Sequence, residues 1–323
     1  MSAEVETMVY AGETPWHGLG AQIEPWLPVE DAIRAAGVDW TVELLPVYGC
    51  NPVDPASGDP LQHVTYDQID GYQRTVRSSD NHTLGIVKSR YTPIQNAQGF
   101  LWFNDLIEAR LAYIESMGSL KGGRIVWGLA RVNMDAVSPI SGDELRPYLL
   151  VSNSHDGTKA GRLGFTEVRV ICWNTLSAAH DSDTSDLIRV LHNGKAEEKI
   201  DLFREAVLGL YSGLEDRATV YAKLATMPVT FGNLERYTCA VLNIKPKDER
   251  KRTPKAIELV RDHFITEVDR VGMNWWAAFN AITAYLSHDS GRSADGRYAE
   301  LWFGVGAKKL TAALTIAVAM SGV

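Results

Sequence analysis

The sequence predicts an α+β fold, in which an antiparallel β-sheet packs with helices in an N-terminal body and a mostly helical region follows. Two observations predict this fold. Strand-like alternation and turn signals fill the chain before about residue 195, and helical periodicity replaces them afterwards. The composition, 45% hydrophobic and 22% charged over 323 residues, is typical of a globular protein with a large buried core. We expect three parts: an acidic N-terminal arm with a short helix over 1–40, an α+β core with the antiparallel sheet over 41–194, and a helical region over 195–323.

The N-terminal arm is expected to be a loop or an ordered arm at best, because prolines and glycines interrupt its first thirty residues. A short helix is predicted over 30–36, where Gly37 ends it. The segment 41–48 has the pattern of a strand, and the three prolines within 51–60 indicate a loop after it.

The core is predicted to continue with a β-hairpin around Asp80-Asn81, since strand-like segments flank this turn sequence. A helix is expected next, because apolar residues recur at helical spacing between 96 and 112. The remaining core strands are expected at 124–132, 148–152 and 165–172, and a helix is expected to begin at Asn174. Beyond residue 195, helical periodicity predicts helices within 196–227, 254–271, 274–288 and 307–320.

Charge is distributed unevenly along the chain, although the formal net charge is only -8. Residues 1–70 contain twelve acidic and one basic residue, whereas residues 71–173 contain twelve basic and nine acidic residues. The middle third is therefore expected to present a mildly basic face, which is compatible with a negatively charged partner.

Catalytic and metal-binding signatures are absent from the sequence. It contains no Walker A motif, no G-x-S-x-G, no H-E-x-x-H and no dinucleotide-binding glycine motif after a strand. None of its histidines pairs with another ligand at metal-binding spacing, and its three cysteines form no C-x-x-C pair. We therefore expect a non-enzymatic protein without metal or cofactor.

The N-terminus lacks the pattern of a signal peptide, and the most apolar stretch, 310–323, is too short to span a bilayer. Scattered cysteines suit a reducing compartment. These features predict a soluble, cytoplasmic protein that does not insert into a membrane.

His155 and Cys172 are the residues that could act as catalytic groups. His155-Asp156 lies in a turn sequence, where Asp is expected to cap the turn and His to face water. Cys172 is expected to be a buried cysteine at the end of a strand, although a nucleophile can occupy such a position. A cryptic nuclease or hydrolase would rest on carboxylates and His155 alone, and it remains a third alternative.

The basic residues of the middle third are the candidate contacts for phosphate. Arg74 and Arg77 should face opposite sides of a regular strand, whereas Lys88 and Arg90 should share a face. The glycine pair between Lys121 and Arg124 fits either a plain β-turn or a loop whose amides receive an anion. Lys159, Arg162 and Arg169 surround the strand at Phe165, and Tyr91 and Phe165 are candidates for base stacking.

Several blocks of sequence together resemble a known family. They are Pro15-Trp-His-Gly-Leu-Gly20, Tyr91-Thr-Pro-Ile-Gln-Asn96 with Phe100, Gly118-Ser-Leu-Lys-Gly-Gly-Arg124, Ser152-Asn-Ser-His-Asp-Gly157, Val168-Arg-Val-Ile-Cys-Trp-Asn-Thr-Leu176 and Asn274-Trp-Trp-Ala-Ala-Phe-Asn-Ala-Ile-Thr283 with Tyr285 and His288. This ordered set resembles the phage/plasmid-like protein family defined by domain of unknown function 932, over almost the whole chain. The resemblance implies carriage by bacteriophages, prophages and plasmids, in the company of genes for DNA repair, recombination and anti-restriction.

The order of elements between Arg124 and Ala179 is also similar to that of phage single-strand annealing proteins of the RecT and Erf kind. That similarity is topological, so it transfers no residue roles. It implies a homo-oligomer that holds single-stranded DNA in a basic groove.

These observations predict a phage-derived protein of the bacterial cytoplasm that binds single-stranded DNA and promotes annealing. The residues expected to contact the DNA are Arg74, Arg77, Lys88, Arg90, Lys121, Arg124, Lys159, Arg162 and Arg169, with Tyr91 and Phe165 for stacking. The alternative is a host-modulating factor that binds a host protein through its N-terminal arm, where Trp16 and Trp26 are the candidate anchors.

Overall fold

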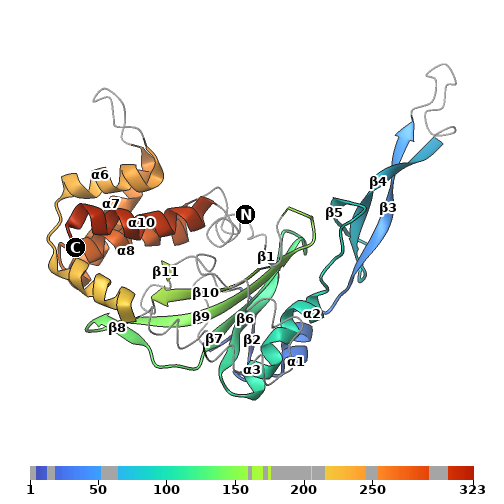
Figure 1. The fold of residues 1–323 in the computed structure, drawn as a ribbon, viewed down its shortest axis with the longest axis horizontal. Coiled ribbons are helices and arrows are strands. Elements are labelled where there is room, and N and C mark those ends of the chain that lie inside the picture. Colours follow the sequence, from blue (N-terminus) through green and yellow to red (C-terminus); the bar gives the residue numbers. More distant parts are fainter. Residues whose placement is uncertain are drawn as a thin grey trace.

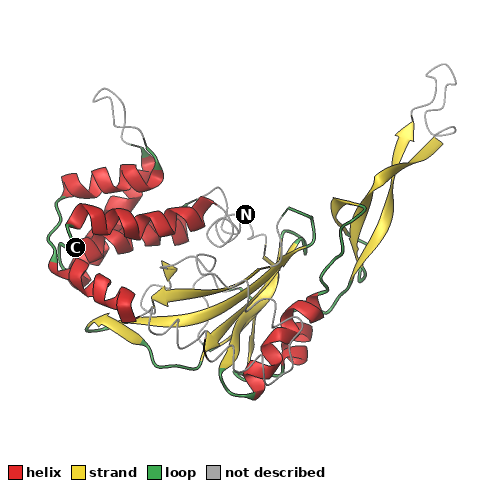
Figure 2. Cartoon of the chain, in the orientation of Figure 1, coloured by secondary structure: helices red, strands yellow, loops and turns green. Residues whose placement is uncertain are grey.

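The computed structural model describes residues 5–12, 19–51, 65–158, 162–169, 174–175, 205, 215–244, 254–290 and 305–323. They form an α+β fold, as the sequence predicts, with antiparallel sheets in the N-terminal part and helices concentrated in the C-terminal part (Figures 1 and 2). None of the helices in these ranges has the length and apolar character that crossing a bilayer requires.

The larger sheet has eight strands. Along its main path the order is β11-β10-β9-β7-β6-β1-β2, and β8 pairs with β9 beside it. Neighbouring strands are antiparallel except for the parallel pair β1–β2. The strands are β1 (Val5–Ala11), β2 (Ala21–Ile23), β6 (Ala112–Leu120), β7 (Ile125–Val132), β8 (Val137–Ile140), β9 (Asp143–Ser154), β10 (Arg162–Arg169) and β11 (Asn174–Thr175).

Helices cover both faces of the larger sheet, because its strands are apolar on both sides. In β7, Ile125 and Trp127 pack into one core, whereas Val126 and Ala130 pack into the other. The second core contains the helices α1 (Val29–Ala35), α2 (Asn96–Phe100), η2 (Leu101–Phe103) and α3 (Asn104–Glu108). The first core contains helical residues 215–226 and the helices α6 (Phe231–Leu242), α7 (Lys255–Val271), α8 (Trp275–Ala284), η3 (Tyr285–Asp289) and α10 (Val305–Ser321).

The smaller sheet has the order β3-β4-β5 and consists of β3 (Val42–Asn51), β4 (Thr65–Arg77) and β5 (Thr83–Lys88). All of its pairs are antiparallel. The short β5 accompanies only the inner part of β4, so β3 and β4 continue outward as a two-stranded ribbon. Figure 1 shows this ribbon projecting away from the body of the molecule, and we call the three strands together the arm.

The structure corrects several element predictions. The first thirty residues are not only an arm or loop, since β1 lies inside the larger sheet between β2 and β6. Strand β6 was not predicted, and neither was helix α6. The helix expected over 96–112 is broken into α2, η2 and α3, and residues 174–175 form the short strand β11 rather than a helix start.

Candidate nucleic-acid interface

The inner end of the arm is fixed to the body by close backbone contacts. The Thr75 hydroxyl of β4 donates a hydrogen bond of 2.7 Å to the buried carbonyl of His155, just beyond β9. Gly85 of β5 lies so close to Asp156 that a Cβ at this position would meet the Asp156 Cα at 2.5 Å. The Gln95 amide makes hydrogen bonds with both the N–H and the carbonyl of Val42, at 2.7 and 3.0 Å. The arm is therefore positioned at its base by the end of β9 and by the segment before α2.

One face of the arm brings an aromatic ring, an apolar side chain and two cations together. Tyr72 pairs with Lys88 across β4 and β5, and Arg74 pairs with Ile86, so these four side chains point to the same side of the sheet. Tyr72 is 46% exposed and Ile86 is 61% exposed, whereas large apolar side chains are usually covered. Lys88 is exposed, and Arg74 is half-buried with a hydrogen bond of 3.1 Å from Nη1 to the Thr83 hydroxyl. We call this set the arm-base face.

Arg77 lies on the opposite side of β4 from Arg74, as their spacing predicts, and its guanidinium is already paired with carboxylates of the chain. It is only 9% exposed, and its guanidinium binds the carboxylates of Glu6 and Asp80, each at 2.7 Å. The hydrogen bond with Asp80 contributes most to raising the pKa of Arg77, and the same contact lowers the pKa of Asp80 to about 2. Arg77 therefore holds the arm to β1 and is not a phosphate contact of the arm-base face.

The turn between β6 and β7 carries Lys121 and Arg124. Lys121 and the two glycines after it have positive φ angles of 56°, 65° and 82°, a conformation that glycine tolerates best. A Cβ at Gly123 would lie 3.0 Å from the Arg77 guanidinium and 3.2 Å from the Trp40 ring. Packing against the Arg77 side of the arm thus accounts for the glycines, which favours the turn over the anion-binding loop. Arg124 is exposed, and its charge helps to lower the pKa of Asp156.

The other candidate residues are distributed as follows. Arg90 is exposed in the turn after β5. Tyr91 is half-buried, its hydroxyl donates to the Ser154 carbonyl at 3.2 Å, and burial raises its pKa. Arg162, Phe165 and Arg169 lie on β10 of the larger sheet, but their side chains, like the whole of Lys159, are outside the described residues. The structure therefore groups Arg74 with Lys88 and places neither Arg77 nor Tyr91 with them.

Tyr72 and Ile86 were missed by the sequence analysis. The signal was present, because Tyr72 lies two residues before Arg74 and Ile86 lies two residues before Lys88 on predicted strands. Alternation alone places each of them beside a candidate cation. What the sequence does not contain is the pairing register that joins the two strands into one surface.

The prediction that His155 faces water is wrong. His155 is fully buried against Trp40, and its Nε2–H donates to Asn96 Oδ1 at 2.7 Å. Burial lowers its pKa to about 4, and this outweighs the attraction of the nearby Asp156. Asp156 does cap the turn, since its Oδ1 accepts hydrogen bonds from the backbone and the hydroxyl of Thr158. A histidine enclosed in this way gives the nuclease alternative no support.

Two further candidates, a metal or cysteine site and the tryptophans of the N-terminal segment, gain no support from the described residues. Within the described residues, no three His, Cys, Asp or Glu side chains are arranged to hold a metal ion, and Cys172 is outside these residues. Trp26 of the N-terminal segment packs on Tyr113 with ring centroids 5.2 Å apart, and the Arg110 guanidinium lies 4.8 Å from its ring centre. Trp26 is therefore held by the body instead of being presented to a partner, and Trp16 is outside the described residues.

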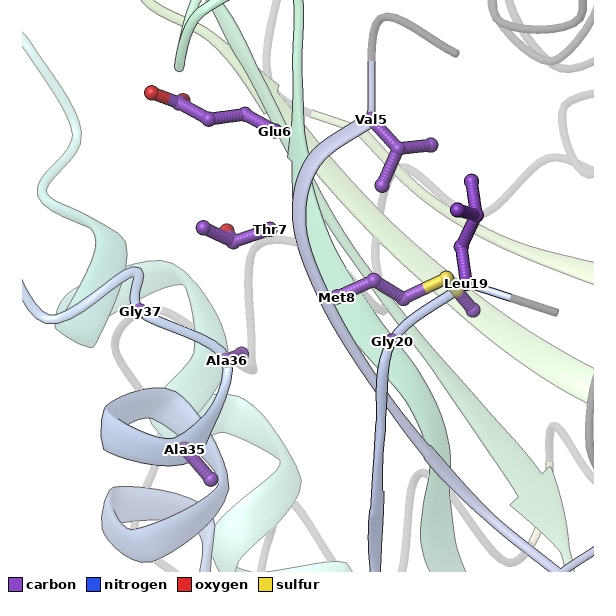
Figure 3. Close-up of a pocket in the computed structure, with 9 residues that line it drawn as sticks. All are labelled: Val5, Glu6, Thr7, Met8, Leu19, Gly20, Ala35, Ala36 and Gly37. Atoms are coloured by element: carbon purple, nitrogen blue, oxygen red, sulfur yellow. The ribbon is translucent and has the colours of Figure 1, made fainter. Parts of the chain in front are cut away.

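A depression of about 360 Å³ lies between β1, the start of β2 and the end of α1 (Figure 3). Its only charged lining residue is Glu6, whose carboxylate binds Arg77 and accepts a hydrogen bond from Ser119. The lining is otherwise small or apolar apart from Thr7, and it comprises Val5, Met8, Leu19, Gly20, Ala35, Ala36 and Gly37. With its single carboxylate already engaged, this depression is a weaker candidate site than the arm-base face.

Comparison with known proteins identifies the family of the chain. The family model described as "Domain of unknown function (DUF932)" matches residues 83–302, which include β5 and most of the larger sheet and the helical region. Neither the curated proteins nor the solved structures give a match to the chain. The match covers well over half of the sequence, so the chain belongs to the family defined by domain of unknown function 932.

Proposed function

We propose that the protein binds single-stranded DNA on the arm-base face. The observation that carries the proposal is the pairing of Tyr72 with Lys88 and of Arg74 with Ile86, which places an exposed ring beside two cations on one surface of the sheet. Sheets that bind single strands use the same combination of exposed aromatic rings and basic side chains.

The chemistry favours an unpaired strand over a duplex. A base can lie flat on the Tyr72 ring only if it is not already stacked inside a double helix. Lys88, directly across from Tyr72 on β5, and Arg74, two residues along β4, then lie next to that base as candidate contacts for its flanking phosphates. Residues two apart on a strand are about 7 Å apart, so the face suits one or two bases.

The neighbouring basic residues show how far the positive charge of the arm-base face extends. Lys88 has no ion pair within the described part of the chain, so its charge is available to a ligand. Arg90 is exposed a short distance beyond it along the chain. Arg124 lies on the turn that packs against the other side of the arm, where it adds positive potential without joining the face.

A role in annealing, within a homo-oligomer encoded by a phage and acting in the cytoplasm of its host, is part of this proposal. Its support is the family to which the chain belongs, because the resemblance to that family implies carriage by phages in the company of genes for DNA repair and recombination. An exposed stacking surface fits that role, because annealing needs bases that stay accessible to a second strand.

Fluorescence anisotropy with a labelled single-stranded oligonucleotide tests the proposal. Tyr72→Ala should weaken binding by about 5- to 100-fold, the effect of losing one stacked base, and should leave the salt dependence unchanged. Lys88→Ala should instead reduce the slope of log affinity against log salt by about 0.7, because one phosphate contact is lost.

Matched controls are available on the helical region. Phe231 is an exposed aromatic residue with the Arg261 guanidinium 4.8 Å from its ring centre, and Lys255 is an exposed lysine. Phe231→Ala and Lys255→Ala should both bind the oligonucleotide like the unmodified protein. Equal losses in the control and arm variants, or no loss in either arm variant, would count against the proposal.

A further inference from the structure

Strand β5 contains a β-bulge beside the arm-base face. Thr75 of β4 pairs with Gly85 of β5. The next residue of β4, Val76, pairs with Thr83 and not with Leu84, so β5 has one residue more than β4 over this stretch. The extra residue, Leu84, is fully buried in the second core. Bulges are common next to functional sites, where they change the direction of a side chain.

The bulge decides which side chain of β5 lies beside Arg74. In a regular ladder Leu84 would be opposite Val76, on the side of the arm-base face. Thr83 would then be turned to the Arg77 side of the sheet. Because of the extra residue, Thr83 pairs with Val76, two residues along β4 from Arg74, and lies on the same side as Arg74.

Thr83 holds the guanidinium of Arg74 from this position. Its hydroxyl accepts a hydrogen bond of 3.1 Å from Arg74 Nη1, and both residues are half-buried. An arginine side chain has several rotatable bonds, so a ligand that binds it must fix many conformations. A guanidinium that is already held loses less conformational entropy when a ligand binds.

The donors of Arg74 that Thr83 does not occupy are available to a ligand. A guanidinium has five N–H donors in a planar fork, and this contact takes one of them. None of the ion pairs found among the described residues includes Arg74, whereas Arg77 binds two carboxylates. A planar fork matches two oxygens of one phosphate, whereas the ammonium group of Lys88 acts as a point charge.

We infer that Thr83 is a positioning residue of the arm-base face, and that the Arg74 guanidinium it holds binds one phosphate through two hydrogen bonds. The inference rests on the proposed function, because this phosphate belongs to the strand whose base stacks on Tyr72. Lys88 attracts the same strand by its charge and does not fix its orientation. The two cations therefore have different roles.

Fluorescence anisotropy with a single-stranded oligonucleotide tests the role of Thr83. Thr83→Val removes the hydroxyl and keeps the size of the side chain, so it should weaken binding by about 2- to 10-fold, the effect of one hydrogen bond. The slope of log affinity against log salt should not change, because no charge is lost. Thr83→Ser should bind like the unmodified protein. Thr65→Val is the control, because Thr65 is an exposed threonine at the outer end of β4.

A double-mutant cycle separates positioning from a general effect on the arm. In an Arg74→Met background there is no guanidinium to hold, so Thr83→Val should cause no further loss of affinity. A loss of the same size in both backgrounds would overturn the inference. Unchanged binding by Thr83→Val in the otherwise unmodified protein would overturn it too.

Exchanging the two kinds of cation tests the phosphate contact. Arg74→Lys should weaken binding by about 10-fold at an unchanged salt slope, because the charge remains but the second hydrogen bond to the phosphate is lost. Lys88→Arg should change the affinity little, since it retains the charge. Equal effects of the two exchanges would show that Arg74 acts only as a charge and would overturn its assignment.

Modification by phenylglyoxal, which reacts with guanidinium groups, tests the positioning without DNA. Arg74 should react faster in Thr83→Val than in the unmodified protein, as measured by mass spectrometry of its peptide, and the exposed Arg90 should react equally fast in both. Equal rates at Arg74 would overturn the role of Thr83 even in a protein that binds DNA. Failure to bind any oligonucleotide would remove the proposed function and the phosphate contact, whereas a faster reaction at Arg74 would still show that Thr83 holds it.

Discussion

Replacing His155 with glutamine removes a buried titratable group and retains a donor to Asn96. In the folded protein the His155 Nε2–H already donates to Asn96 Oδ1, and Nδ1 has no hydrogen-bond partner within the described residues. Protonation of Nδ1 would place a second N–H, and a charge, in an enclosed site. For this reason burial lowers the pKa of His155 from 6.5 to about 4.

The magnitude follows from the pKa difference between the unfolded and folded states. The unfolded chain takes up the proton near pH 6.5, whereas the folded chain resists it until about pH 4. The unfolding free energy is therefore not lowered by this group above about pH 6.5, and it falls progressively as the pH decreases toward 4. A difference of about 2.5 units corresponds to roughly 3 kcal/mol.

Urea unfolding at about pH 7 and about pH 4 measures this loss. The carboxylates titrate in both proteins, so the difference between the unmodified chain and His155→Gln isolates the histidine. When the pH falls from about 7 to about 4, the unmodified chain should lose roughly 3 kcal/mol more unfolding free energy than the variant. His82→Gln is the control, because His82 is exposed. A difference between His155→Gln and the unmodified chain that does not change with pH would refute the reasoning.

Three further substitutions test the packing of the body and the arm. Arg77→Met should lower the unfolding free energy by about 2 kcal/mol, since two carboxylates lose their partner, yet it should leave oligonucleotide binding unchanged; a loss of binding equal to that of Arg74→Met would contradict the assignment of Arg77. Gly118→Ala should destabilise the protein by about 3 kcal/mol because a Cβ would collide with the backbone of β1, and a Tm equal to that of the unmodified chain would show that the sheet is not packed as described. Trp276→Phe should cost about 2 kcal/mol in urea unfolding, because it removes the 2.7 Å hydrogen bond from Nε1 to the buried Asp143 carboxylate; an unchanged midpoint would argue against that contact.

The helical region could be predicted from the sequence because its signal is local. The predicted helix over 254–271 agrees with α7 (Lys255–Val271), and the one over 307–320 agrees with α10 (Val305–Ser321). In both segments apolar residues recur at the helical period, so one face packs into the hydrophobic core wherever the rest of the chain lies. The hairpin of β4 and β5 was predicted for a similar reason, since its turn lies between its own strands.

Strand β1 could not be predicted in the same way. It lies beside a stretch of prolines and glycines, and its partner β6 is more than a hundred residues away in the sequence. Strand order is decided by such distant pairings, which leave no local pattern. The helix predicted over 96–112 is too long, because the spacing of apolar residues continues in the sequence although the chain turns at Arg110, where φ is 59°.

The candidate site was predicted only in part. The spacing of Arg74 and Arg77 was enough to place them on opposite sides of a strand. It could not show that Glu6, 71 residues earlier in the chain, binds Arg77 and removes it from the site. The placement of Tyr72 beside Lys88 likewise depends on the register of β4 and β5, and turn geometry and packing together decide that register.

Photochemical cross-linking tests the central claim most directly, because it locates the base as well as detecting binding. A single-stranded oligonucleotide containing iododeoxyuridine is irradiated with the protein at low salt, and the attached peptide is identified by mass spectrometry. If a base stacks on the arm-base face, the cross-link should fall on Tyr72, and Lys88→Ala should reduce its yield. A cross-link confined to residues outside the arm, or none at oligonucleotide concentrations that saturate binding, would contradict the claim.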